Sequence, residues 1–271
     1  MNIDILFLNQ ELKVSKDLIS DQSLFEEYCK THSFEGKSNQ VIAMPASYSK
    51  NENLTYLVGL GDIKDSQDLY ELGINIGSKI KEDVEIDFLN TEINFVPIID
   101  GILYAQYKFN DYKSKDESAP NNIKFKKTDT VENEIKQSSI FWVRDQINTP
   151  ALDKSPEDFI QNVNNLVDSS SIKVEVFDQK WLEENNFGGV LGVAKGSDRA
   201  PYLVVGKYNE KAKYQISLIG KGVLFDSGGY SLKSPAGMET MKTDMSGAAS
   251  AWGVINLVAR TKQNIGLTVY T

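Results

Sequence analysis

The sequence contains only one cysteine and one histidine in 271 residues. With Cys29 alone, the chain cannot form an internal disulfide, and it suits a reducing compartment, so we expect a cytoplasmic protein. With His32 alone, a zinc site built from several histidines is excluded, and Ser-His-Asp catalysis would need His32 as its base. The polar stretch around it, THSFEGKSN, is more typical of a loop with a solvated histidine. Metal chemistry would therefore have to use carboxylates, amines, carbonyls or water.

Long apolar runs and basic blocks are also missing. No apolar run approaches 18 residues, so no membrane span is predicted. The first 14 residues carry charges within their apolar stretch and lack a small-residue cleavage site, unlike a secretory signal. The net charge is −9, and no Lys/Arg block is long enough to suggest a basic patch. We therefore expect neither nucleic acid nor an anionic membrane as partner. A composition of 41% hydrophobic and 25% charged residues is typical of soluble globular proteins.

The first hundred residues alternate short apolar strands with helical patterns. Strands are predicted at residues 3–8, 41–44, 56–60 and 84–89. Apolar residues at helical spacing predict a helix over residues 65–80, and a second helix is expected over residues 98–107. This alternation is typical of an α/β layer structure.

The composition becomes polar and charged over residues 112–133, which we interpret as a linker or a surface excursion. We therefore expect two domains, an N-terminal α/β domain with its linker at residues 1–130 and a second α/β domain at residues 131–271. Ser155 and Pro156, followed by two acids, predict the start of a helix. The other elements expected in this domain are helices over residues 131–147 and 246–260, a short helix around Trp181 closed by Gly188 and Gly189, and strands at residues 172–176, 202–205, 216–219 and 265–270.

Residues 220–249 form a glycine-rich segment, GKGVLFDSGGYSLKSPAGMETMKTDMSGAA, which carries four charged candidates on short loops. They are Lys221, Asp226, Lys233 and Asp244. Taken singly, each has an ordinary explanation as a turn residue or a solvated charge. The GKG sequence does not complete a phosphate-binding loop, which requires GxxxxGK followed by Ser or Thr. Spacing alone favours a functional site only slightly over these ordinary explanations.

The combination of motifs resembles the leucyl aminopeptidase (cytosol aminopeptidase) family, M17, of cytosolic exopeptidases that use two zinc or manganese ions. The resemblance rests on GKGVLFDSGG, then SLK, then MKTDMSGAA, with matching intervals between the four charged residues. Further similar segments follow in the expected order: TYLVGLG at 55–61, YAQYKFNDYKS at 104–114, VRDQINTPAL at 143–152 and LGVAKGS at 191–197. The resemblance implies a macro-like N-terminal α/β domain followed by an α/β metallopeptidase domain.

The resemblance also implies roles for the candidates. Asp226 would bridge two divalent metal ions, Zn or Mn, while Lys221 and Asp244 would ligate one of them. Lys221 could do so only as the neutral amine, its pKa depressed by the cation. Lys233 would be the catalytic residue that stabilises the oxyanion. The implied reaction removes N-terminal residues such as leucine from peptide substrates, using the two metal ions and a bridging water. Family members assemble as homo-hexamers, so a homo-oligomer is expected.

One family segment is missing from the sequence, Asn-Thr-Asp-Ala-Glu-Gly-Arg, which supplies an aspartate, a glutamate and a catalytic arginine. We therefore expect a catalytic domain truncated before this second ligand segment and inactive on its own. A gene fragment, a deliberately shortened chain and a degenerate homologue are all open interpretations. One rival hypothesis is a non-catalytic remnant that acts as a binding or assembly subunit. Another is nucleotide or ADP-ribose binding by the N-terminal domain, which lacks a convincing phosphate loop. We expect Lys221, Asp226, Lys233 and Asp244 to converge at the C-terminal end of a parallel sheet.

Overall fold

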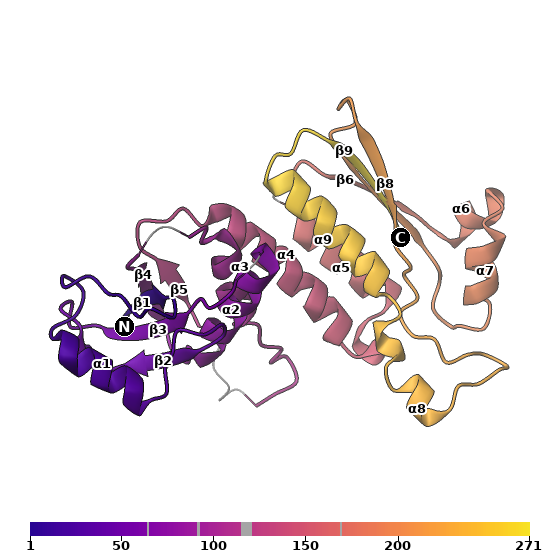
Figure 1. Cartoon of the computed structure of the whole chain (residues 1–271). Coiled ribbons are helices and arrows are strands. Elements are labelled where there is room, and N and C mark those ends of the chain that lie inside the picture. Colours follow the sequence, from indigo (N-terminus) through magenta and orange to yellow (C-terminus); the bar gives the residue numbers. More distant parts are fainter. Residues whose placement is uncertain (64, 91–92, 115–120, 169) are drawn as a thin grey trace. The chain divides into compact units, whose positions relative to one another are not determined.

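The computed structural model describes residues 1–63, 65–90, 93–114, 121–168 and 170–271. Its Cα trace separates into two compact units, Met1–Gln137 and Ser138–Thr271, each with its own sheet and core (Figure 1). The expected α/β class is confirmed. The units divide within helix α4 (Val131–Asn148), whereas the sequence suggested a boundary just before it. No helix among the described residues is both long and apolar enough to cross a membrane.

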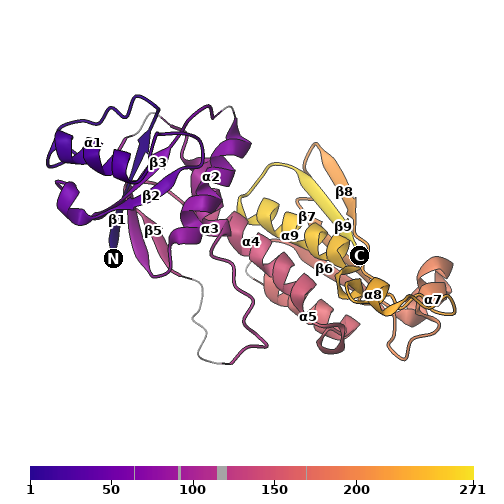
Figure 2. The same cartoon turned by 60° about the horizontal axis from the view of Figure 1, so that its bottom comes forward.

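The first unit is built on a five-stranded sheet in the order β2-β3-β1-β4-β5. Figure 2 labels β1, β2, β3 and β5 of this sheet. Strands β1, β3, β4 and β5 run parallel, and β2 pairs antiparallel with β3. The strands are β1 (Asn2–Leu8), β2 (Val41–Met44), β3 (Leu54–Gly59), β4 (Val84–Phe88) and β5 (Ile123–Phe125). Its helices are α1 (Gln22–Thr31), η1 (Ala46–Tyr48), α2 (Ser66–Lys79) and α3 (Val96–Tyr104).

Both faces of this sheet are covered by helices. Ile3, Ile5 and Phe7 of β1 belong to the core that includes α2 and α3, whereas Leu6 and Leu8 pack with α1. Successive side chains of a strand point to opposite faces, and β1 is buried on both faces from Ile3 to Leu8, so it requires cover on both sides. The first unit is therefore a three-layer α/β/α structure.

Two features of this unit were not predicted, strand β5 and helix α1. Residues 112–133 are not simply a linker, because β5 lies inside them and pairs parallel with β4; residues 115–120 of this segment lie outside the described structure. Helix α1 was not predicted, although Asp21 caps it by accepting from the N–H groups of Ser23 and Leu24. His32 ends this helix, is exposed, and stacks on Tyr28.

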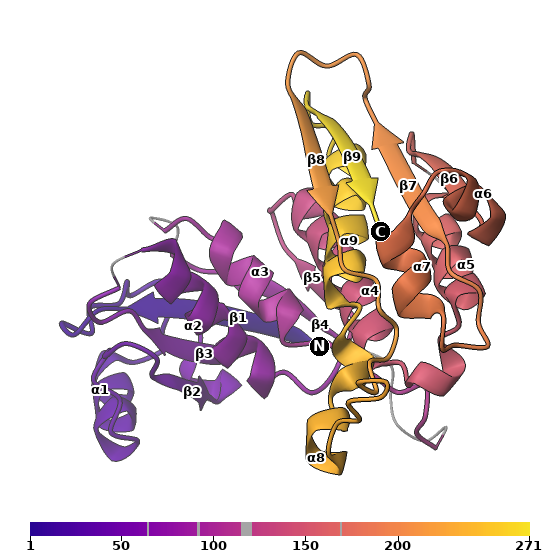
Figure 3. The same cartoon turned by 90° about the vertical axis from the view of Figure 1, so that its right-hand side faces the viewer.

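The second unit has a four-stranded mixed sheet in the order β6-β7-β9-β8 (Figure 3). Only β8 and β9 are parallel; β6 with β7 and β7 with β9 are antiparallel. The strands are β6 (Lys173–Phe177), β7 (Leu203–Tyr208), β8 (Gln215–Ile219) and β9 (Gly266–Tyr270). The helices are the C-terminal part of α4, then η2 (Ala151–Asp153), α5 (Pro156–Val167), α6 (Gln179–Glu184), α7 (Gly188–Ala194), α8 (Pro235–Met238), η3 (Met241–Thr243) and α9 (Ser246–Arg260).

Helices α5 and α9 pack on one face of this sheet, and Trp252 of α9 is completely buried in the core that these helices form with the strands. Helix α5 begins as predicted, with Ser155 and Asp158 in a reciprocal capping box. Gly188 and Gly189 open α7 rather than only closing the preceding helix, so that expectation was incomplete. The buried face of α9 fixes the helix whose first turn adjoins the glycine-rich segment.

Candidate metal centre

Lys221 is placed by a close crossing between the end of β8 and the first turn of α9. A Cβ added to Gly220 would lie 2.6 Å from the carbonyl oxygen of Gly247 and 2.7 Å from the Cα of Ala248. Only glycine permits this approach without displacing backbone. The N–H of Ala248 donates to the carbonyl of Lys221 at 2.9 Å, so one of the free donors of the helix start holds the loop.

Asp244 lies between η3 and α9, and its N–H donates to the carbonyl of Met241. Its Oδ2 is 3.0 Å from the Nζ of Lys221, and its side chain is only 19% exposed. This oxygen is inaccessible to solvent, and among the described residues it accepts no hydrogen bond of good geometry. The contact with Lys221 is therefore an ion pair rather than an aligned hydrogen bond. The buried Oδ2 of Asp244 can still accept a hydrogen bond or bind a cation.

Asp226 and Lys233 form a second ion pair on the loop that leads to α8. Lys233 Nζ lies 2.5 Å from Asp226 Oδ2 and also donates to the Asp226 carbonyl at 3.1 Å. The hydrogen bond from Lys233 holds the pKa of Asp226 below its usual range, with help from the Gly228 N–H and the charge of Lys221. The turn requires glycine at Gly228, where φ is +93° and a Cβ would lie 2.3 Å from the Ser231 carbonyl oxygen.

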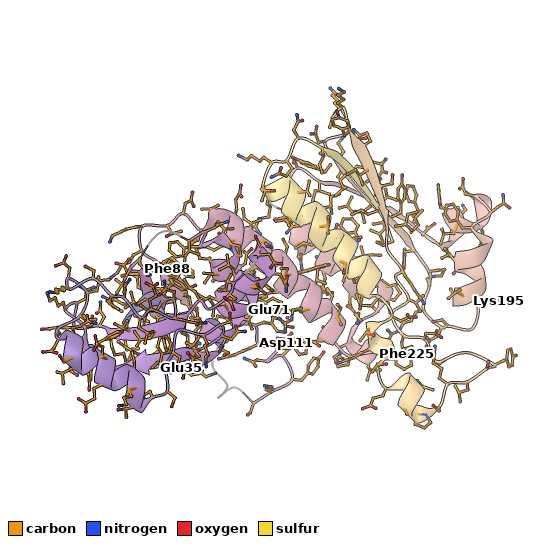
Figure 4. The ribbon with its side chains drawn as sticks, in the orientation of Figure 1. Glu35, Glu71, Phe88, Asp111, Lys195 and Phe225 are labelled. Atoms are coloured by element: carbon orange, nitrogen blue, oxygen red, sulfur yellow. The ribbon has the colours of Figure 1, made fainter. Side chains whose placement is uncertain are left out.

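The outer side of this loop is exposed and apolar. Tyr230 is fully exposed, Leu232 is largely exposed, and Phe225 is partly exposed. Figure 4 labels Phe225 in the region between α8 and the first turn of α9. An apolar hollow next to the ion pair is lined by Phe225, Leu232, Lys233, Pro235, Met238 and Glu239.

The structure thus brings the four candidates into two ion pairs, linked by the electrostatic effect of Lys221 on Asp226. They do not lie at the end of a parallel sheet as expected, because the sheet is mixed and only β8 supplies a strand end directly before Lys221. Carboxylate oxygens and an amine nitrogen are donors that suit Mn²⁺ or Zn²⁺, and the unsatisfied Asp244 oxygen fits such a ligand role. In the described ranges, no three or more His, Cys, Asp or Glu side chains are grouped so that they could hold a metal ion.

Three cationic residues next to the site were not singled out from the sequence: Lys154, Lys242 and Arg199. Lys154 is 1% exposed, and its Nζ donates to carbonyl oxygens of Gln146, Thr149 and Lys242. No local pattern marks this lysine as buried, because one of its three partners, Lys242, lies 88 residues further along the chain.

Comparison with known proteins agrees with the motif. Residues 141–271 match the catalytic domain of the cytosol aminopeptidase family. A probable cytosol aminopeptidase of Clostridium perfringens is 35% identical over 200 residues, which cover 68% of this chain and 40% of that protein. One from Rhodococcus jostii is 30% identical over 254 residues, 86% of this chain and 50% of that protein. The chain belongs to the cytosol aminopeptidase family. It spans about half the length, or less, of these curated relatives.

Solved structures show the same fold. A cytosol aminopeptidase from Coxiella burnetii aligns with a TM-score of 0.78 at 24% identity, covering 99% of this chain and 57% of that chain. A bottromycin maturation enzyme, BotP, in complex with Mn aligns with a TM-score of 0.82 at 20% identity, covering 99% and 58%. The part matched to the cytosol aminopeptidase catalytic domain contains Lys221, Asp226, Lys233 and Asp244.

Proposed function

We propose that this chain carries part of the active site of a metal-dependent aminopeptidase that removes N-terminal residues, such as leucine, from peptides. The observation that carries the proposal is the convergence of Lys221, Asp226, Lys233 and Asp244 in two neighbouring ion pairs within a domain of the cytosol aminopeptidase family. A Mn complex of a protein with this fold supports the use of divalent cations. We further propose a cytoplasmic location, because the relatives are named cytosol aminopeptidases and the only cysteine, Cys29, is free and buried.

In this proposal Asp226 would bridge two cations, and Lys221 and Asp244 would ligate one of them. Divalent cations at such a site lower the pKa of a bound water and polarise the substrate carbonyl. Lys221 would ligate through its amine nitrogen, and its side chain, 60% exposed, already lies against Asp244.

Lys233 would supply positive charge to the oxygen of the scissile carbonyl. In the structure its ammonium instead pairs with Asp226, so it would have to exchange that partner for the substrate. The position of Lys233 on an open loop suits such an exchange, and the apolar hollow that it lines suits an apolar side chain of the peptide. A charged donor at a developing oxyanion is worth about 10²–10³-fold in turnover.

The proposed ligands are two carboxylates, Asp226 and Asp244, and one amine, Lys221, fewer protein ligands than two cations need. We therefore propose that residues 1–271 bind divalent cation weakly and do not turn over peptides alone. In this proposal, peptides are the substrates of a chain that has the complete site. A homo-oligomer, such as the family's hexamer, is likewise proposed for that complete chain.

The test is equilibrium dialysis of residues 1–271 against Mn²⁺ or Zn²⁺, together with hydrolysis of a leucine chromogenic amide. We expect weak binding that is lost in Asp226→Asn and Asp244→Asn, and no turnover. Binding of two cations per chain with turnover would show that a complete site is present and would overturn the partial-site proposal. Binding unaffected by either substitution would overturn the assignment of the ligands.

The role of Lys233 is separable in a longer chain that includes the Asn-Thr-Asp-Ala-Glu-Gly-Arg segment. There, Asp226→Ala should remove cation and activity together, because a bridging ligand is lost. Lys233→Ala should keep its cations and lower turnover by about 10²–10³-fold. Loss of cation from Lys233→Ala would contradict the role given to this lysine.

A further inference from the structure

Lys154 is a buried lysine without a carboxylate partner among the described residues. It is 1% exposed, and its three donors are used by three carbonyl oxygens: Gln146 at 2.7 Å, Thr149 at 3.2 Å and Lys242 at 3.1 Å. Burying an ammonium costs several kcal/mol unless it is well hydrogen-bonded. An apolar side chain could fill this space without that cost, so the distinctive contribution of Lys154 is to join the backbone segments that supply these carbonyls.

Two of these carbonyls belong to the C-terminal end of α4. Gln146 lies in its last turn and Thr149 directly follows it. Helix C-termini carry unpaired carbonyls and partial negative charge, which favour a cation. Two of the three hydrogen bonds of the Lys154 ammonium therefore anchor it to the end of an 18-residue helix.

The third carbonyl belongs to η3, the turn that carries Asp244. Lys242 accepts from Lys154 and sends its own ammonium back to the carbonyl of Asn148 at 2.7 Å. Two lysines thus tie one short turn to one helix end, in opposite directions. Asp244 follows Lys242 by two residues and is hydrogen-bonded within the same turn through its N–H to Met241.

Arg199 steadies the segment that carries Lys154. Its Nη1 donates to the carbonyls of Ala151 and Lys154 at 3.1 and 3.2 Å. Arg199 thus holds both η2 and the backbone of Lys154. Lys154 has no hydrogen left for a ligand or a reaction, which excludes a role as nucleophile or proton donor.

We propose that Lys154 is a positioning residue for Asp244: its buried ammonium fixes η3 against the end of α4 and so sets the place of the carboxylate that pairs with Lys221. This inference rests on the proposed function, because Asp244, the residue that Lys154 would position, is one of the proposed metal ligands. It also makes a claim about local order that can be measured without metal.

The experiment compares hydrogen–deuterium exchange of residues 1–271 with that of Lys154→Met, which keeps the length of the side chain and removes the ammonium. We expect exchange over residues 241–245 to rise at least tenfold, while the interior of α9 at residues 251–259 and the first unit keep their protection. Lys211→Met, an exposed lysine between β7 and β8, is the matched control and should change nothing in these segments. Unchanged exchange at 241–245, or an equal rise throughout the second unit, would overturn the positioning role.

A second variant covers the case in which Lys154→Met does not fold. Lys242→Met removes only the return contact to Asn148 and keeps the carbonyl that Lys154 binds. Because the Lys154 contact remains, any rise should be smaller and confined to residues 241–245; a rise as large as tenfold there, with Lys154 in place, would overturn the proposal.

Mn²⁺ affinity separates this inference from the function on which it rests. Residues that orient a metal ligand typically contribute about 10–100-fold to affinity. If the parent chain binds Mn²⁺, Lys154→Met should weaken binding by that factor, and equal affinity in a folded variant would contradict the proposal. If the parent chain binds no Mn²⁺ at all, the ligand assignment fails, and the exchange data alone decide whether Lys154 orders the turn.

Discussion

The two ion pairs of the candidate site differ in how firmly the surrounding chain holds them. Lys221 and Asp244 stand on backbone that is clamped: a close crossing at Gly220, a hydrogen bond to the start of α9, and the lysine contacts behind η3. Asp226 and Lys233 stand on a loop whose outer side chains, Tyr230 and Leu232, are exposed. Packing and hydrogen bonds therefore hold the backbone of one half of the site, the clamped pair, whereas the other half, the open pair, stands on an exposed loop.

The largest expected loss of stability comes from a substitution in the core that holds α9, the helix next to Lys221 and Asp244. Trp252 of α9 is completely buried, and its Nε1–H donates to Thr271. Trp252→Ala should lower the free energy of unfolding of the second unit by about 3–5 kcal/mol, the usual cost of truncating a buried aromatic. Urea denaturation followed by far-UV circular dichroism would measure it. A loss below about 1 kcal/mol would mean that α9 is not held as described.

The next effect is a dependence of stability on pH. Burial, with repulsion from Lys242, lowers the pKa of Lys154 to about 8, from an ordinary value of 10.5. The unfolded chain therefore binds more protons between these two values, and the free energy of unfolding rises with pH across this window. Below pH 8 the full penalty of the buried charge remains. Relative to Lys154→Met, the parent chain should gain up to about 3 kcal/mol between pH 8 and 10.5.

Urea denaturation of both proteins at pH 7.5 and pH 10 would check this difference. The variant lacks the titrating group, so subtracting its values removes the contributions of the other lysines. A parent chain that loses stability relative to the variant over this range would show the opposite sign and contradict a depressed pKa.

A smaller difference in stability is expected between alanine substitutions at the two glycines on either side of Lys221. Gly220→Ala would force a Cβ against the Gly247 carbonyl and should cost about 1–3 kcal/mol, as overpacking does. Gly222→Ala places its Cβ at an ordinary 3.6 Å from the Cβ of Ala248, and its stability should stay within about 0.5 kcal/mol of the parent. Thermal unfolding of both variants gives the comparison, and equal losses would argue against the close crossing.

The smallest effect is expected on the open half. Tyr230→Ala removes a side chain without burial and should change the free energy of unfolding by less than about 0.5 kcal/mol. The same denaturation measurement applies. A loss comparable to that of Trp252→Ala would mean that this loop is packed in solution and would remove the distinction between the two halves.

The sequence predicted the helix and the strand next to the site better than it predicted the long-range contacts that hold them. Ser246–Arg260 was predicted as a helix with its bounds correct, because alanine and aliphatic residues dominate it. The strand before Lys221 was predicted from its apolar run. Local composition is sufficient for such elements, since their signals lie within a few residues of each other.

Features made by distant segments could not be predicted in this way. Lys154 resembles any surface lysine until residue 242 covers it, and β5 resembles a linker until it pairs with β4. The sheet of the second unit was expected to be parallel, but strand direction depends on connections that periodicity does not report. The motif placed four candidate residues on loops; only the structure shows that they divide into a clamped pair and an open pair.

The most direct test of this account is the paramagnetic effect of Mn²⁺ on the amide NMR signals of residues 1–271. At low Mn²⁺ we predict selective broadening of the signals of Lys221, Asp226 and Asp244 and their neighbours, and the loss of this effect in Asp244→Asn. Broadening that instead centres on the acidic surface formed by Asp62, Asp68 and Glu71, or that persists in Asp244→Asn, would contradict the claim that these residues form a cation site.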